Sequence, residues 1–140
     1  MLRKERQRRF RDGRLKLWVV LDEAAIRRPV AGAKLQLDQL RYLREACHSP
    51  TLTLQVIPYG VGGHAAPTGF SMLRFAERDL PDIVYVENLT SALYLDKQSD
   101  VDRYLLAMER LSIVAHEPNE TTGIIDEIIS QLESEGPDDE

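Results

Sequence analysis

The sequence predicts an α+β fold, a single domain in which one mixed β-sheet of about five strands is covered by helices. Three observations support this class. The first 57 residues hold a short apolar run, two helical segments and a second apolar strand. Alternating apolar residues fill the middle, and two segments with apolar residues at helical spacing follow. The expected order of elements is therefore α-β-α-α-β-β-β-β-α-α.

The chain opens with a polar segment, Met1–Arg11, which predicts a helix that ends at an Asp-Gly pair. Leu17–Leu21 is a short, continuous apolar run, and this predicts a buried strand. Asp22 follows the strand and is a good N-cap for a short helix. Glu23 then lies in the first turn of that helix, where the helix dipole favours a carboxylate.

The next two segments predict a long helix and a second strand. Lys34–Cys47 places four residues on one helical face, namely Leu37, Leu40, Leu43 and Cys47. Thr51–Ile57 alternates between apolar and polar residues, which is typical of a strand. Because a strand–helix–strand connection within one sheet joins parallel strands by a right-handed crossover, we expect the two apolar strands to pair in parallel.

The middle of the chain predicts three further strands. Gly69–Phe75 alternates between its two faces. Ile83–Glu87 and Ala92–Leu95 are separated by the short segment Asn88–Ser91, and this arrangement predicts a β-hairpin. These strands are expected to form a meander within the same sheet.

Two helices are expected after the hairpin. The first begins at Asp96 or Ser99 and reaches about Ala115, with a buried stripe of Val101, Leu105, Met108 and Leu111. The second begins at Pro118 and ends near Leu132. Its apolar residues are Ile124, Ile125, Ile128, Ile129 and Leu132. Since this is more apolar surface than one docking face needs, we expect a homodimer with this helix or the basic N-terminal arm at the interface.

The composition indicates a folded protein in a reducing compartment. A chain of 140 residues, 43 % hydrophobic and 29 % charged, is long enough for one domain with a core. Cys47 is the only cysteine, so no internal disulfide can form. The apolar runs are far shorter than the roughly 20 residues that cross a bilayer, and no segment resembles a secretory signal. We therefore expect a cytoplasmic protein.

Charge is distributed unevenly along the chain. Residues 1–16 hold eight Lys and Arg against two acidic residues, a net charge of +6. Because the whole chain carries −5, the remaining 124 residues carry −11. We interpret residues 1–16 as a basic connector helix, residues 17–132 as the α+β domain and residues 133–140 as a disordered acidic tail. A nucleic-acid contact is the alternative for the arm, since Lys and Arg release counterions from phosphates.

Tyr59–Pro67 is a Gly-rich loop between two predicted strands. A phosphate-binding loop needs a helix directly after it, so a mobile wall beside a pocket is the better interpretation. His64 lies in this loop and is a candidate for ligand contact or for simple exposure to solvent. His48 and His116 are expected at helix ends, where we interpret both as structural. No pair of His or Cys residues has metal-ligand spacing, so we expect no metal and no cofactor.

Two carboxylates are the main candidates for a polar site. Glu87 ends an apolar strand in phase with its apolar residues, and Glu23 directly follows a buried strand that we expect to be central. Arg27 lies one helical turn after Glu23 and can pair with it. We expect Glu23, Arg27, His64 and Glu87 to converge on a cleft between the Gly-rich loop and the ends of the first and fourth strands. The alternative is a surface pair Glu23–Arg27, with Glu87 bonded to a turn amide.

Six segments in a fixed order are similar to one known family. They are Leu17–Val30, Gln39-Leu40 with Leu43, Thr53–Pro58, the loop through His64, Gly69-Phe70 and Val84–Leu95. Together they resemble an actinobacterial domain of unknown function that usually follows an Xre-type helix-turn-helix, over roughly Arg3–Leu132. The resemblance implies WhiJ-like transcription regulators, often encoded beside a small partner protein. It implies no enzymatic activity and no established ligand.

The chain itself has no helix-turn-helix, and residues 1–16 match only the end of the helix that connects the two domains in this family. We therefore expect a regulatory domain that senses a small molecule or a partner protein and, alone, lacks sequence-specific affinity for DNA. Two alternatives remain open. One is a stand-alone interaction module of a toxin–antitoxin-like or immunity-like system, and the other is a hydrolase or transferase that uses Glu87, Glu23 and His64.

Overall fold

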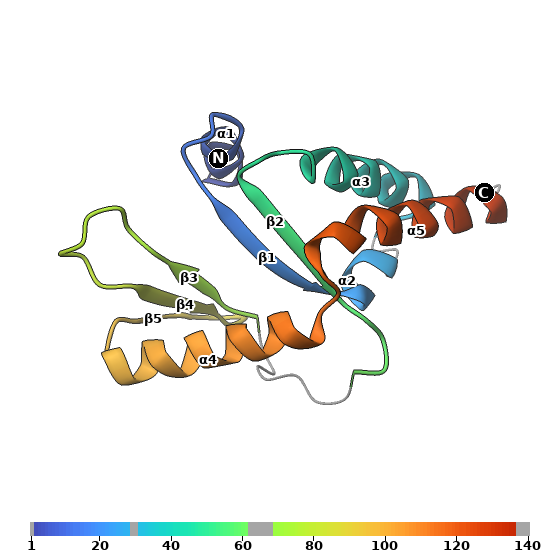
Figure 1. Ribbon diagram of the computed structural model, residues 1–140. Coiled ribbons are helices and arrows are strands. Elements are labelled where there is room, and N and C mark those ends of the chain that lie inside the picture. The colour runs from blue at the N-terminus through green and yellow to red at the C-terminus, as the bar shows by residue number, and fades with distance from the viewer. Residues whose placement is uncertain (1, 29–30, 62–68, 137–140) are drawn as a thin grey trace. The chain divides into compact units, whose positions relative to one another are not determined.

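The computed structural model describes residues 2–28, 31–61 and 69–136, and its α+β class and order of elements agree with the prediction (Figure 1). The elements are α1 (Leu2–Arg11), β1 (Leu17–Asp22), α2 (Glu23–Arg27), α3 (Ala33–Ala46), β2 (Leu52–Ile57), β3 (Ser71–Leu73), β4 (Ile83–Glu87), β5 (Ala92–Leu95), α4 (Gln98–Val114), the 3-10 turn η1 (Pro118–Glu120) and α5 (Thr121–Glu135). None of the helices in these ranges is long and apolar enough to cross a bilayer.

The strands form two sheets, so the prediction of one mixed sheet is wrong. β1 and β2 pair in parallel, as predicted, while β3, β4 and β5 form a separate antiparallel meander. The described residues divide accordingly into two compact units, Met1–Gly60 with Ala115–Glu140, and Val61–Val114. β1, which we expected to be central, has β2 as its one neighbouring strand in the described part of the chain.

The outer edge of β2 explains why the parallel sheet stops at two strands. The backbone N–H of His116 donates to the carbonyl oxygen of Val56 over 2.9 Å, and the hydroxyl of Thr121 donates to the carbonyl oxygen of Leu54 over 2.5 Å. The Nε2 of Gln55 donates to the carbonyl oxygen of His116 over 3.1 Å. Residues 116–121 therefore occupy the backbone groups that a third strand would need. We call these three bonds the β2 clasp.

The core of the first unit lies between the β1–β2 sheet and helices α2, α3 and α5. Its buried residues come from all these elements except β1, and they are Ile26, Leu40, Leu54, Val56, Ile125 and Ile128. Ile124, Ile129 and Leu132 of α5 pack against the same cluster. The apolar surface that we had assigned to a dimer through the last helix is therefore used inside the unit. α5 also continues to Glu135, three residues into the segment predicted to be disordered.

The second unit has its own core on one face of the antiparallel sheet. The pairing Glu87↔Ala92 and the bond from the Asn88 N–H to the Ser91 carbonyl oxygen confirm the predicted hairpin. α4 covers the sheet with Val101, Tyr104 and Leu105, against the buried strand residues Val84 and Val86. The rings of Phe70 and Tyr104 meet edge to face, with centroids 5.0 Å apart.

Ile125→Ala should lower the free energy of unfolding by about 2–5 kcal/mol, because Ile125 is fully buried and the change leaves a cavity. Urea denaturation followed by circular dichroism measures the effect. Ile113→Ala is the matched control, since Ile113 is 80 % exposed and its change should stay within about 0.5 kcal/mol. Equal effects of the two substitutions would contradict this placement of the core.

Thr121→Val tests the β2 clasp. It keeps the shape of the side chain but leaves the buried carbonyl of Leu54 without its hydroxyl donor, at a cost of about 1–3 kcal/mol. Thr122→Val is the control because it makes the same chemical change one residue later, at a half-buried position. A Thr121→Val protein that unfolds at the same urea concentration as the Thr122→Val protein would show that the clasp contributes little.

Candidate functional site

The short helix α2 is the element that positions the candidate site. Asp22, the last residue of β1, caps it as predicted, because its Oδ1 accepts a hydrogen bond from the Ala24 N–H over 2.9 Å. At its other end, the Nε2 of Gln36 on α3 donates to the carbonyl oxygens of Ile26 and Arg27, over 3.0 and 2.8 Å. A five-residue helix is too short to be stable alone, so these contacts and its packing hold it in place.

Glu23 and Arg27 form the predicted pair beyond the C-terminal ends of β1 and β2. The Oε1 of Glu23 lies 3.1 Å from the Nε of Arg27, and their side chains are only 13 % and 26 % exposed. The Nε–H of Arg27 has no hydrogen-bond partner of good geometry among the described residues, so the attraction to Glu23 is that of an ion pair. The Oε2 of Glu23 also accepts a hydrogen bond from the Tyr59 N–H over 2.9 Å.

Arg27 extends this cluster to α5 and to the segment after β2. Its NH1 donates to the Oε1 of Gln131 over 2.9 Å, and its guanidinium carbon lies 5.9 Å from the centre of the Tyr59 ring. The arginine is therefore shared between an ion pair, a hydrogen bond and a cation–π contact. We call Glu23, Arg27, Tyr59 and Gln131 the polar cluster. Because the charges of Glu23 and Arg27 compensate each other, we interpret its main role as holding α2 in position.

The other two predicted site residues are not part of the polar cluster as described. Glu87 ends β4 in the second unit, where its side chain is exposed. His64 lies outside the residues that the structure describes. Glu23 and Arg27 are paired as expected. That all four residues, Glu23, Arg27, His64 and Glu87, converge on one cleft stays a prediction.

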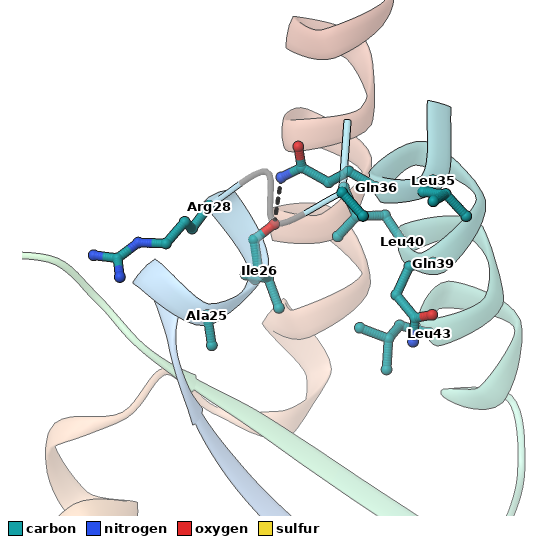
Figure 2. A pocket seen from close by; sticks show the side chains of 9 residues that line it. Ala25, Ile26, Arg28, Leu35, Gln36, Gln39, Leu40 and Leu43 are labelled. Carbon is teal, nitrogen blue, oxygen red and sulfur yellow. Dashed lines mark hydrogen bonds between the residues drawn. The ribbon is translucent and has the colours of Figure 1, made fainter. Parts of the chain in front are cut away.

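An apolar groove lies between α2 and α3, and its lining includes Gln36, whose amide also bonds to α2 (Figure 2). Its volume is about 290 Å³, close to the smallest pockets that hold small organic molecules. Six of its nine lining residues are apolar, namely Ala25, Ile26, Ala31, Leu35, Leu40 and Leu43. Arg28, Gln36 and Gln39 complete the lining. We call this space the α2–α3 groove.

The polar groups around the α2–α3 groove have different roles. Gln36 is committed to the C-terminal end of α2, and its Oε1 is buried without a partner in the described ranges. Gln39 is exposed and can offer both a donor and an acceptor to a molecule in the groove. Arg28 is exposed as well, and in Figure 2 its side chain extends away from α3. The groove therefore suits a small, mainly apolar molecule with one polar group.

Sequence reasoning missed this groove. It assigned Leu37, Leu40 and Leu43 to the buried face of α3 and gave no role to Leu35, which is 59 % exposed. The available signal for the groove was Leu35, an apolar residue outside the predicted buried face of α3, together with Gln36 and Gln39. Because α2 is so short, the sequence did not indicate that its apolar side faces α3.

Three observations bear on the chemistry open to the described residues. No three His, Cys, Asp or Glu side chains within them gather closely enough to hold a metal ion. Burial raises the pKa of the Cys47 thiol, which disfavours the reactive thiolate. The carboxylate of Glu23 has one oxygen beside Arg27 and the other on the Tyr59 N–H.

Comparison with known proteins gives a family and no activity. A family model described as "Domain of unknown function (DUF5753)" matches residues 1–127. No curated protein and no solved structure matches the chain. Since the matched residues cover most of its 140 positions, the chain belongs to this family of domains of unknown function.

Proposed function

We propose that this chain is the sensing domain of a helix-turn-helix transcription regulator and that it binds a small apolar molecule in the α2–α3 groove. The observation that carries the proposal is the way α2 is held. One wall of the groove is a five-residue helix whose position depends on a cap, on Gln36 and on the polar cluster. A molecule in the groove would contact α2 through Ala25 and Ile26, on the side that faces α3.

The resemblance to helix-turn-helix-associated regulators supports the first half of the proposal, the role in a transcription regulator. Such a regulator needs an element with two positions of similar free energy. α2 meets this requirement better than α3 or α5, which are 14 and 15 residues long. A ligand that prefers one position of α2 shifts the balance by its difference in affinity for the two positions. A shift of α2 would then also affect α5, because Arg27 pairs with Glu23 on α2 and donates a hydrogen bond to Gln131 on α5.

Groove binding can be tested with 8-anilinonaphthalene-1-sulfonate, a dye whose fluorescence rises in apolar surroundings. We expect the folded chain to bind the dye and Ala25→Phe to reduce its affinity by about tenfold, because the ring fills part of the groove. Leu89→Phe is the control, since it adds a ring at a fully exposed hairpin position. Equal affinities of the two variants would rule out the α2–α3 groove as the dye site.

The regulatory role is tested by a reporter gene. The wild-type chain and the Ala25→Phe chain are each joined through α1 to a helix-turn-helix domain, and repression of its operator is measured. Because the phenylalanine occupies the groove as a ligand would, we expect repression to change by a factor of about three or more, which corresponds to a modest coupling free energy. Repression equal to that of the Leu89→Phe control would refute a sensing role for the groove.

The isolated chain should bind DNA weakly and without sequence preference. Eight of its 18 Lys and Arg residues lie on α1 and the segment to Lys16, whereas the rest of the chain carries a net charge of −11. Such binding is electrostatic, so the logarithm of the affinity should fall steeply with the logarithm of the salt concentration. Fluorescence anisotropy with two unrelated duplexes checks this, and tight binding to one duplex alone at physiological salt would contradict it.

A further inference from the structure

Among the described residues, no strand pairs with the edge of β1 that faces away from β2. The Leu17 N–H donates to the Thr51 carbonyl oxygen over 2.8 Å, and Leu17 is in register with Leu52. In a parallel pair this register directs the backbone groups of every second residue of β1 toward β2. Those of Trp18 and Val20 therefore point to the other side, where no strand pairs with β1 within the described residues.

Burial shows the same asymmetry between the two strands. Val19 and Leu21 of β1 are in register with Leu54 and Val56 of β2, and all four contribute to the core of the first unit. Leu54 and Val56 are buried, whereas Val19 and Leu21 are only half-buried. The β2 clasp covers one side of the sheet, and the described residues form no equivalent set of bonds on the other side.

An open edge of this kind is unusual. Parallel strands are normally interior strands, and proteins protect exposed edges by keeping them short or placing charges on them. β1 is six residues long and consists of five apolar residues and Asp22. The edge strands of the second unit, β3 and β5, have three and four residues. β1 is thus the longest and most apolar free edge among the described strands.

We propose that the free edge of β1 pairs with β1 of a second copy of this chain, in antiparallel orientation and with Val20 opposite Val20. The result is a four-stranded sheet in the order β2-β1-β1-β2. In this register the two Val20 residues exchange a pair of backbone hydrogen bonds, because both direct their N–H and C=O outward. Val19 of each copy lies opposite Leu21 of the other, so the half-buried core side chains of the two copies cover one another.

Charge complementarity favours a second copy in this orientation. β1 is preceded by the basic residues Arg14 and Lys16 and ends at the acidic residues Asp22 and Glu23. Antiparallel pairing about Val20 makes Lys16 of each copy a diagonal neighbour of Asp22 of the other, on the same face of the sheet. The two-fold axis repeats this contact. A parallel arrangement would instead bring the basic ends together.

Trp18 and Val20 complete the interface on the face that carries Gln55. Trp18 is 49 % exposed, although its indole N–H donates to the Oε1 of Gln55 over 2.7 Å. In the proposed register Trp18 of each copy is a diagonal neighbour of Val20 of the other, and an exposed aromatic surface is covered. A single strand edge is a small interface, so the dimer should form reversibly at micromolar concentrations. The inference concerns the first unit alone and is independent of the proposed sensing role.

The test is sedimentation equilibrium of the whole chain from low micromolar to near-millimolar concentration. We expect the apparent mass to rise from 16.0 kDa toward twice that value. Val20→Lys should raise the dissociation constant by about tenfold or more, because it puts like charges opposite each other at the two-fold axis. Val20→Glu should do the same for the same reason. An equimolar mixture of the two variants should regain the dimer, since Lys then lies opposite Glu.

Tyr94→Lys is the matched control, because it places the same charge on β5, an edge strand of the other sheet, at a residue that is 70 % exposed. It should leave the dissociation constant unchanged. A wild-type chain that stays at 16.0 kDa throughout overturns the proposal. So does a dimer that Tyr94→Lys disrupts and Val20→Lys leaves intact, or a mixture of the two Val20 variants that stays monomeric while both remain folded by circular dichroism.

If a charge at position 20 prevents folding, an uncharged substitution at the same position still tests the proposal. Val20→Cys, in a chain that also carries Cys47→Ala, should form a disulfide between two copies under mild oxidation. Hydrogen-bonded antiparallel pairs have Cα atoms about 5.5 Å apart, within the range of disulfides. Tyr94→Cys in the same background should cross-link much more slowly. Equal rates at the two positions would overturn the register.

Discussion

The β2 clasp is the interaction on which the rest of the first unit depends. His116 and Thr121 bond to strand residues that lie 60 and 67 positions earlier in the sequence, before the second unit begins. Closing so long a segment costs conformational entropy, and this cost must be offset by contacts made where the chain comes back to β2. The clasp supplies them, because it satisfies buried carbonyl groups of β2 and starts α5 at the position from which Ile125 and Ile128 reach the core.

Gln55 shows how closely this closure is linked to the sheet. It is a polar residue in the middle of β2 and is only 6 % exposed. Its amide nitrogen donates to the carbonyl oxygen of His116, and its amide oxygen accepts the indole N–H of Trp18. A buried amide is tolerated when its groups are paired, and these two bonds connect β1 to the returning chain. The strand pair and the clasp therefore form one hydrogen-bonded layer.

Local patterns in the sequence were enough to predict most of the elements. The apolar run of β1, the cap at Asp22, the face of α3 and the β4–β5 hairpin depend on neighbours close in sequence, and each is present. The parallel pairing of β1 and β2 followed from the helices between them.

The division into two sheets could not be read from the sequence in this way. Whether β2 accepts a third strand is decided by Thr121 and by the backbone of His116, and neither carries a pattern that marks a strand edge. The isoleucines of α5 were misread for a related reason. Their number suggested surplus apolar surface, but α3, α2 and both strands of the parallel sheet use it from several directions.

The candidate site was predicted only in part. Glu23 and Arg27 could be paired from their spacing along a helix, which is a local rule. The sequence did not indicate that Tyr59 and Gln131 belong to the same cluster. Tyr59 follows β2 and Gln131 lies on α5, so only the tertiary fold brings them to Glu23 and Arg27. The α2–α3 groove was missed since it depends on the angle between two helices. The backbone of His116 takes part in the β2 clasp, whereas the structural role that we expected for its ring stays a prediction.

Asp22 brings the two proposed surfaces together. It is the last residue of β1, whose free edge is the proposed dimer surface, and it is also the cap of α2, which forms one wall of the groove. A cap side chain loses its hydrogen bond if the helix turns relative to the strand, at a cost of about 1 kcal/mol. A molecule that moves α2 therefore acts on the end of the strand at which a second copy would pair. Because such coupling is reciprocal, dimerisation would in turn favour one position of α2, and hence one state of the groove.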